Sequence, residues 1–214
     1  MKRVFGIFEV IFDIFYLITA FILGIYMIFR ATSQVNIMAG VMSIVLSAGD
    51  CFHLVPRIMV IKTGNEEKWR KALGLGKEIT SISMTIFYLL LWQIGVTAYG
   101  IDNTFITYLI YALAVIRIGI CVMPQNQWTH RHPPLNYSIL RNIPFFIMGV
   151  LIAICFLINI VPNQPLSLCW LAILLSFAFY LPVVLLANKN PKVGMLMFPK
   201  TCAYLWILIM CLGL

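Results

Sequence analysis

Seven ionisable side chains lie within long apolar stretches of this sequence, at positions where a charge is costly: Glu9, Asp13, Asp50, His53, Arg57, Arg117 and Lys200. At the centre of a bilayer each charged side chain costs about 2.5–3.5 kcal/mol even on lenient insertion scales. Such groups pair with one another inside a helix bundle or line a wet cavity. Two interpretations follow: ion pairs that fix the register of the helices, or a functional site.

Asp50, His53 and Asp13 are the residues in this set best suited to acid–base catalysis. A buried carboxyl group beside an imidazole can exchange protons with a substrate, which favours a lipid hydrolase embedded in the membrane. The carboxyl groups that descend from Asp50 through Asp13 to Glu9 fit an alternative, a proton-linked transporter or carrier.

Helical spacing places further polar residues beside these groups. Glu9, Asp13 and Tyr16 share one face of the first apolar stretch, and a second stretch presents hydroxyl, carboxyl, imidazole and guanidinium groups at steps of three or four residues. The sequence therefore predicts a polar pocket in the cytoplasmic half of a bundle, lined by Glu9, Tyr16, Ser43, Ser47, Arg57, Arg117, Lys200 and Tyr204.

Metal and chromophore chemistry are two further possibilities for the same region. Asp50 and His53 supply two possible zinc ligands, but His130 and His132 lie in a loop that would have to fold back to complete the site. No metal site is therefore predicted, and any cofactor is left unknown. Lys200 in the last apolar stretch resembles the Schiff-base lysine of rhodopsins, so a seven-span receptor or chromophore- or lipid-binding protein is a further alternative.

The elements that must position these residues are membrane spans. Of the 214 residues, 62% are hydrophobic and 10% are charged, whereas soluble domains carry roughly a quarter charged residues. Runs of about 20 apolar residues, the length that crosses a bilayer as a helix, predict one all-α transmembrane domain over residues 1–214. The expected spans are 4–29, 36–61, 78–100, 104–123, 140–161, 165–187 and 194–213.

The loop cations predict the orientation of the bundle. Cations cluster in alternate connectors, and cytoplasmic loops are enriched in Lys and Arg. The cations on the expected cytoplasmic side are Lys2, Arg3, Lys62, Lys68, Arg70, Lys71, Lys77, Arg131, Arg141, Lys189 and Lys192. The N-terminus is then cytoplasmic and the C-terminus outside, in the cytoplasmic membrane of a bacterium.

Loop composition also limits the partners. The net charge of +8 is explained by cytoplasmic loops, so we expect membrane lipids, and a lipid or small molecule within the bundle, rather than nucleic acid. The polar stretch 63–77 is expected to be a loop, in which Gly74 and Gly76 form a flexible turn before the third span.

Proline positions mark the cytoplasmic side of the bundle as distorted. Proline inside a helix frees a backbone carbonyl and bends the chain. A cavity that opens inward is therefore predicted near Pro56, Pro124, Pro144, Pro182 and Pro199.

The segment Ser47-Ala48-Gly49-Asp50-Cys51-Phe52-His53-Leu54 resembles known multi-span enzymes. It is similar to the early Ser and Gly-Asp signature of the lysoplasmalogenase family, which cleaves vinyl-ether lysolipids. It also resembles the Ser, Asp and His pattern of alkaline ceramidases and adiponectin-type receptors, which hold zinc. The chain departs from the first family at Ser176, which is followed by Phe177 instead of Asp, and from the second in lacking histidines in its last span.

A wider resemblance covers three stretches. Residues 49–58, 74–92 and 198–206 are similar to a group of small uncharacterised bacterial seven-span membrane proteins. This resemblance implies the same seven-span fold and no particular activity.

Overall fold

The computed structural model describes residues 2–101, 103–131, 133–159, 162–186 and 190–214, and the side chains of all these except residues 2–5 and 191. Met1, His132, Lys189 and the last expected residues of the fifth and sixth spans, 160–161 and 187, lie outside the described residues. The side chains of Lys2 and Arg3 do so as well.

The described residues form helices and loops, without a β-strand. The α-helices are α1 (Lys2–Phe29), α2 (Gln34–Thr63), α3 (Glu66–Tyr99), α4 (Thr104–Val122), α5 (Leu135–Ile158), α6 (Cys169–Leu186) and α7 (Met197–Cys211), with short 3₁₀ helices η1 (Pro124–Asn126) and η2 (Pro191–Leu196). Seven helical segments, the last including most of η2, are long and apolar enough to cross a membrane. The prediction of an all-α, multi-pass membrane protein is confirmed.

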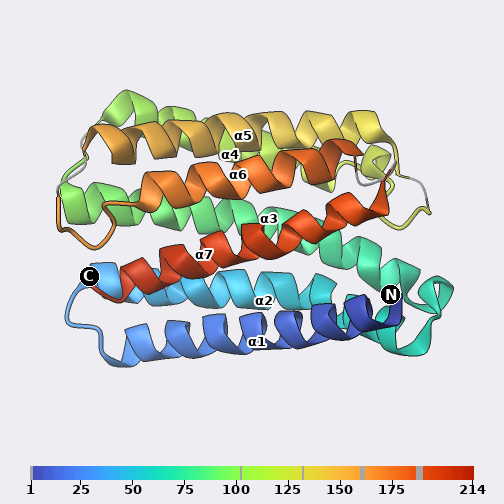
Figure 1. Cartoon of the computed structure of the whole chain (residues 1–214). Helices are drawn as coiled ribbons and strands as arrows, with labels where there is room; N and C mark the ends of the chain where they lie inside the picture. The colour runs from blue at the N-terminus through green and yellow to red at the C-terminus, as the bar shows by residue number, and fades with distance from the viewer. Residues whose placement is uncertain (1, 102, 132, 160–161, 187–189) are drawn as a thin grey trace.

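The helices run along a common direction, and the two termini lie at opposite ends of the bundle (Figure 1). The α2–α3, α4–α5 and α6–α7 connections lie at the end that holds the N-terminus, called here the N-terminal end. Helix α2 packs between α1 and α3, and α7 contacts α6, α1 and α2. Helix α7 therefore packs against α6 on one side and against the α1–α2 pair on the other.

Helix α3 begins earlier than expected. The stretch 63–77 was predicted to be a loop, yet α3 starts at Glu66 and continues without a break to Tyr99. Asn65 caps the helix by accepting a hydrogen bond from the amide of Lys68, and Glu66 and Glu67 lie in its first turn, where the helix dipole favours negative charge. Because α3 has 34 residues, a length of about 51 Å at 1.5 Å per residue, its first turns extend past the apolar layer.

Gly74 and Gly76 do not form the expected flexible turn, because both lie inside α3. A Cβ on Gly76 would lie 2.2 Å from the carbonyl oxygen of Phe52 and 2.7 Å from Cα of His53. A Cβ on Gly74 would lie 2.4 Å from the carbonyl oxygen of Trp128. Both glycines therefore allow close approach of neighbouring backbone to α3.

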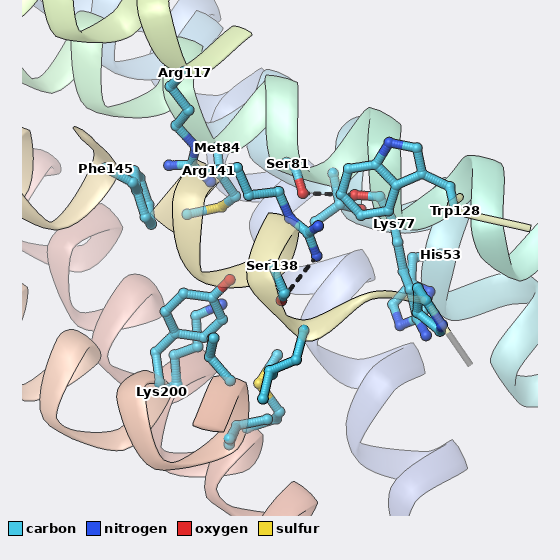
Figure 2. A pocket seen from close by; sticks show the side chains of 17 residues that line it. His53, Lys77, Ser81, Met84, Arg117, Trp128, Ser138, Arg141, Phe145 and Lys200 are labelled. Carbon is cyan, nitrogen blue, oxygen red and sulfur yellow. Dashed lines mark hydrogen bonds between the residues drawn. The ribbon is translucent and has the colours of Figure 1, made fainter. Parts of the chain in front are cut away.

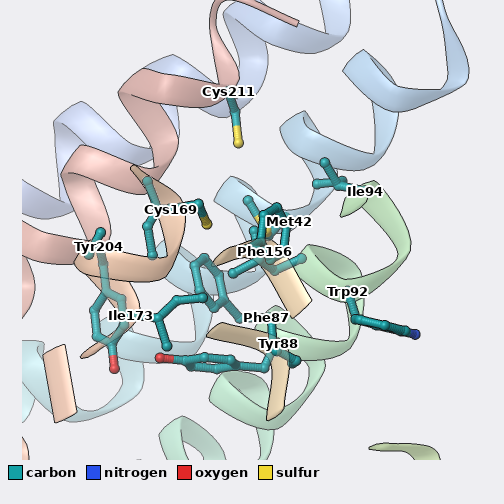
Figure 3. Packing of buried hydrophobic residues seen from close by; sticks show 14 of the residues in the cluster. Met42, Phe87, Tyr88, Trp92, Ile94, Phe156, Cys169, Ile173, Tyr204 and Cys211 are labelled. Atoms are coloured by element: carbon teal, nitrogen blue, oxygen red, sulfur yellow. The ribbon is translucent and has the colours of Figure 1, made fainter. Parts of the chain in front are cut away.

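Apolar packing fills the half of the bundle nearer the C-terminus. Met42 of α2, Phe87 of α3, Phe156 of α5 and Ile173 of α6 interdigitate there with α7 (Figure 3). These side chains are at most 4% exposed, so this half is a close-packed core. The buried cationic side chains lie in the other half.

Candidate functional site

A partly open cavity of about 310 Å³ is lined by residues of α2–α7 and of the α4–α5 loop, toward the N-terminal end of the bundle. Figure 2 shows its lining side chains. Its lining residues are His53, Lys77, Thr80, Ser81, Met84, Arg117, Trp128, Pro133, Leu135, Ser138, Arg141, Phe145, Tyr180, Val183, Val184, Met197 and Lys200. The volume is in the range of small-molecule sites.

The cavity wall is cationic. Lys77, Arg117, Arg141 and Lys200 come from α3, α4, α5 and α7, and no Asp or Glu is among the described lining residues. The ion pairs found in the described part of the chain, Glu9–Arg57 and Glu67–Arg70, lie elsewhere. Within the described part of the chain, positive charge in this wall therefore has no carboxylate partner within 4 Å.

Arg117 is the most deeply buried of these cations. Its side chain is 2% exposed, and its Nε and Nη1 atoms have no hydrogen-bond partner among the described residues. The guanidinium carbon lies 3.2 Å from the centroid of the Phe145 ring, and a cation is attracted to such a ring face. The ring supplies no hydrogen-bond acceptor lone pairs, so the Nε and Nη1 donors of Arg117 have no acceptor among the described residues.

Arg141 is held in place by its neighbours. Its Nη1 donates to Oδ1 of Asn126 at 3.0 Å, and its Nη2 donates to Oγ of Ser138 at 3.1 Å. The guanidinium carbon lies 4.0 Å from the ring centroid of Trp128. The amide of Asn126 also caps α4 by donating to the carbonyl oxygens of Ile120 and Met123. Arg141 is therefore oriented by rigid elements rather than left mobile in a loop.

Lys200 lies at the opposite wall of the cavity. Its side chain is buried, with Nζ 4.2 Å from the ring centroid of Tyr180 and 5.3 Å from that of Tyr204. The hydroxyl of Tyr180 donates to Oδ1 of Asn142 at 3.0 Å, which fixes the ring. Arg117, Arg141 and Lys200 thus share one arrangement, a cation packed on an aromatic ring at the cavity surface.

His53 is the predicted catalytic residue that lies in the cavity wall. Its Nδ1 atom is buried and has no hydrogen-bond partner in the described structure. The nearby hydroxyls of Thr80 and Ser81 donate to backbone carbonyls, those of Gly49 and Lys77 respectively. These contacts keep both hydroxyls in α3 at the cavity edge.

The predicted carboxyl groups lie outside the cavity lining. Asp50 accepts a hydrogen bond from the Tyr16 hydroxyl at 2.6 Å, and Asp13 is 6% exposed with no partner for Oδ2 in the described residues. Glu9 pairs with Arg57 at 2.6 Å, where the Arg57 side chain is 45% exposed. The structure thus places the three acidic residues of α1 and α2, Glu9, Asp13 and Asp50, apart from the cationic residues that line the cavity.

The remaining predicted pocket residues have local partners. Ser43 donates to the carbonyl oxygen of Ala20 at 2.6 Å, and Ser47 donates to that of Ile44 at 3.1 Å. Tyr204 is buried, and its ring packs against that of Phe87. Of the predicted set, Arg117, Lys200 and His53 meet at the cavity, whereas the two serines, Glu9 and Arg57 do not.

No group of three or more His, Cys, Asp or Glu side chains in the described residues is arranged to hold a metal ion. His130 is exposed, and His132 lies outside the described residues. Asp50 and His53 could bind a metal as two ligands, but no third His, Cys, Asp or Glu side chain in the described residues completes a site with them.

Several cavity residues were not selected from the sequence. Lys77 and Arg141 were used only as markers of orientation, and Trp128, Ser138 and Tyr180 were not selected at all. A signal was present, since Lys77 and Arg141 each stand three or four residues from a serine, Ser81 and Ser138, at the start of an apolar run.

Comparison of the chain with protein-family models, with curated proteins and with solved structures gives no significant match.

Proposed function

We propose that this membrane protein binds an organic anion that carries an apolar portion, and that it acts as a carrier or receptor for that molecule. The observation that carries the proposal is Arg117, a buried cation whose Nε and Nη1 atoms have no acceptor among the described residues. It lies in the wall of a cavity that has no described acidic lining residue. A buried charge without a partner is strongly destabilising. A bound anion would supply the missing partner.

The cation types favour an oxygen-rich head group. Arginine presents a planar fork of donors that fits carboxylate, sulfate or phosphate oxygens, and charge-assisted hydrogen bonds of this kind are the strong ones. Arg117 and Arg141 approach from α4 and α5, while Lys200 approaches from α7 (Figure 2). A head group with three oxygens could contact cations from more than one wall.

The remaining wall favours an apolar tail. Val183 and Val184 of α6, Met197 at the start of α7 and Leu135 at the start of α5 supply apolar lining of the cavity. Burial of a methylene group contributes about 0.8 kcal/mol, so an alkyl chain along these residues would add affinity that inorganic anions lack. The lipid-like ligand class expected from the sequence fits this division.

The distribution of cations supports an inward-facing cavity. Lys62, Lys68, Arg70 and Lys71 lie at the N-terminal end, where the cavity also lies, whereas Arg30 lies at the other end. By the positive-inside rule, the N-terminal end faces the cytoplasm of a bacterial cell. The C-terminus then lies outside, so alkaline phosphatase fused to it should be active. An inactive alkaline phosphatase fusion together with a fluorescent GFP fusion at the C-terminus would show the opposite orientation.

Binding of a defined amphiphilic anion tests the proposal. The purified protein in dodecyl maltoside would be titrated with decyl sulfate, inorganic sulfate or decanol, with binding followed by calorimetry. We expect saturable binding of decyl sulfate, weaker binding of sulfate and none of decanol at the same site. Equal responses of the wild type and Arg117→Gln to decyl sulfate would show that binding is only detergent-like adsorption.

Hydrolysis of the bound molecule is a second candidate, supported by the free Nδ1 of His53 in the cavity wall. His53 would take a proton from water as the water oxygen adds to an ester carbon, and would return the proton to the departing alcohol. Asp50 lies one turn from His53 on α2 and is bound to Tyr16. Asp50 would therefore act only by stabilising the protonated imidazole.

Product analysis separates the two candidates. Proteoliposomes that contain the wild type, Asp50→Asn or His53→Gln would be incubated with vinyl-ether and ester lysolipids, and free aldehyde and fatty acid measured. Turnover by the wild type that His53→Gln abolishes would favour the hydrolase. Intact lysolipid after prolonged incubation would leave the carrier or receptor.

A further inference from the structure

The acidic group on α1 and α2 is buried beside the cationic cavity without lining it. Asp13 has a buried Oδ2 without a partner in the described residues, and Asp50 accepts only the Tyr16 hydroxyl there. Two carboxyl groups in a low-dielectric interior repel each other when both are ionised, and each is costly without a cation. This pair is a candidate site for a proton.

Lys200 connects the acidic pair to the cavity. It lines the cavity and also lies close enough to Asp50 to interact with its charge. No ion pair within 4 Å is found between them in the described structure. The Lys200 ammonium therefore attracts Asp50 without being bound to it, and it remains available to an anion in the cavity. An anion in the cavity would compete with Asp50 for this ammonium group.

The charged and titratable neighbours of the pair come from three helices. Asp50 faces Tyr16 from α1 and Lys200 from α7. Asp13 faces Glu9 on its own helix and both Arg57 and Asp50 on α2. Tyr204 of α7 faces Tyr16, and His53 lies one turn from Asp50 and faces Lys77 of α3. Arg57 is already paired with Glu9, which leaves Lys200 as the cation that offsets Asp50.

We propose that binding of the anion in the cavity is coupled to uptake of one proton by the Asp13–Asp50 pair, with Lys200 as the link. When the anion draws the Lys200 ammonium toward the cavity, Asp50 loses the attraction of that cation. A proton from solution then joins one carboxylate oxygen and restores the charge balance. This coupling rests on the proposed anion binding and makes the bound state a neutral pairing of anion and proton.

A pathway for that proton is present on α1. Glu9 is partly exposed beside Arg57, and Asp13 follows it by one turn, with Tyr16 the next residue on the same face. Tyr16 reaches Asp50 through its hydroxyl. We expect the proton to reach the pair along this face of α1 from the N-terminal end.

Proton counting during binding tests the coupling. Decyl sulfate is the probe, because its head group does not titrate near neutral pH. The wild type in weakly buffered dodecyl maltoside would be titrated with decyl sulfate while a pH dye records proton uptake. We expect about one proton per bound probe and a dissociation constant that rises with pH, by at most about tenfold per pH unit for one linked proton.

Variants assign the proton. Asp50→Asn and Asp13→Asn should still bind decyl sulfate but take up less than half as many protons per bound probe, and either one suffices if the other fails to fold. Glu67→Gln is the acid control, because Glu67 is exposed and paired with Arg70 at the start of α3, and its proton count should equal that of the wild type. His53→Gln should also keep the wild-type proton count per bound probe.

Failure of the proton coupling can be told apart from failure of the proposed anion binding. Wild-type binding of decyl sulfate without proton uptake would overturn the coupling and leave the proposed function standing. Proton uptake that survives in Asp13→Asn/Asp50→Asn, or that disappears in His53→Gln, would also overturn it. Absence of decyl sulfate binding in the wild type would contradict the proposed function itself. Binding that depends on Na⁺ at constant pH, without proton uptake, would replace the proton by a metal cation.

Discussion

Arg117 of α4 rests on the ring of Phe145 of α5, with its guanidinium carbon 3.2 Å from the ring centroid. The ring covers one face of the guanidinium group, and its Nε and Nη1 atoms find no acceptor in the described residues. A cation held in this way is positioned before a ligand arrives, which lowers the entropy cost of binding.

Replacement of Arg117 should separate binding from stability. In Arg117→Gln we expect decyl sulfate to bind about tenfold to hundredfold more weakly, since hydrogen bonds to charged groups contribute about 1.5–3 kcal/mol. Thermal unfolding in dodecyl maltoside should be unchanged or shifted upward, because a buried charge without a partner is removed. Arg30→Gln, at the opposite end of the bundle, is the control and should bind normally. Weak binding accompanied by a large loss of stability would instead indicate a structural role.

Asn126 should support both the end of α4 and Arg141. Its amide donates to the carbonyl oxygens of Ile120 and Met123, and its Oδ1 accepts from Arg141. Asn126→Ala should lower the free energy of unfolding by about 1–3 kcal/mol, because it leaves buried groups unsatisfied. It should also weaken decyl sulfate binding.

The control for Asn126 is Asn136→Ala in the first turn of α5, where the side chain is exposed. Thermal unfolding of the two variants provides the comparison. Equal stability of both variants would show that the contacts of Asn126 are dispensable.

Gly76 should be the most restrictive glycine among the helix contacts of α2 and α3. In Gly76→Ala the new Cβ would lie 2.2 Å from the carbonyl oxygen of Phe52, and backbone cannot move aside as a flexible side chain can. We expect a loss of about 1–3 kcal/mol of stability, typical of overpacking, and altered binding, since His53 follows Phe52.

Gly119 of α4 is the matched control, because nothing lies within 4 Å of a Cβ added there. Gly119→Ala should be neutral or stabilising by up to about 1 kcal/mol through higher helix propensity. Thermal unfolding of Gly76→Ala at the wild-type temperature would show that α2 and α3 are less tightly packed than described.

The fold followed from the sequence because apolar length is a strong signal in membrane proteins. Each expected span matches a helix, since lipid leaves the backbone few alternatives. The predicted loop over residues 63–77 was wrong, because a polar composition does not by itself exclude a helix. Asn65 followed by Glu66 and Glu67 is a helix-capping pattern that indicates the start of α3. Gly76 was interpreted as a turn because close contact between helices leaves no mark in a single sequence.

The candidate site was predictable only in part. Burial of a charge within an apolar run drew attention to Arg117 and Lys200, which the structure places in the cavity wall. The sequence could not show that Asp50 turns to Tyr16 while Arg117 turns to Phe145, because these contacts cross between helices. One interpretation of these charges was a set of ion pairs between helices, whereas Glu9–Arg57 is the one such pair within the set in the described structure.

The position of a bound anion tests the central claim most directly. A structure of the protein with 10-bromodecyl sulfate would locate the head group by its density and the chain end by the anomalous signal of bromine. We expect the sulfate between Arg117, Arg141 and Lys200, with the bromine near Val183 and Met197. A sulfate on the outer surface of the bundle, with the cavity occupied only by water, would contradict it.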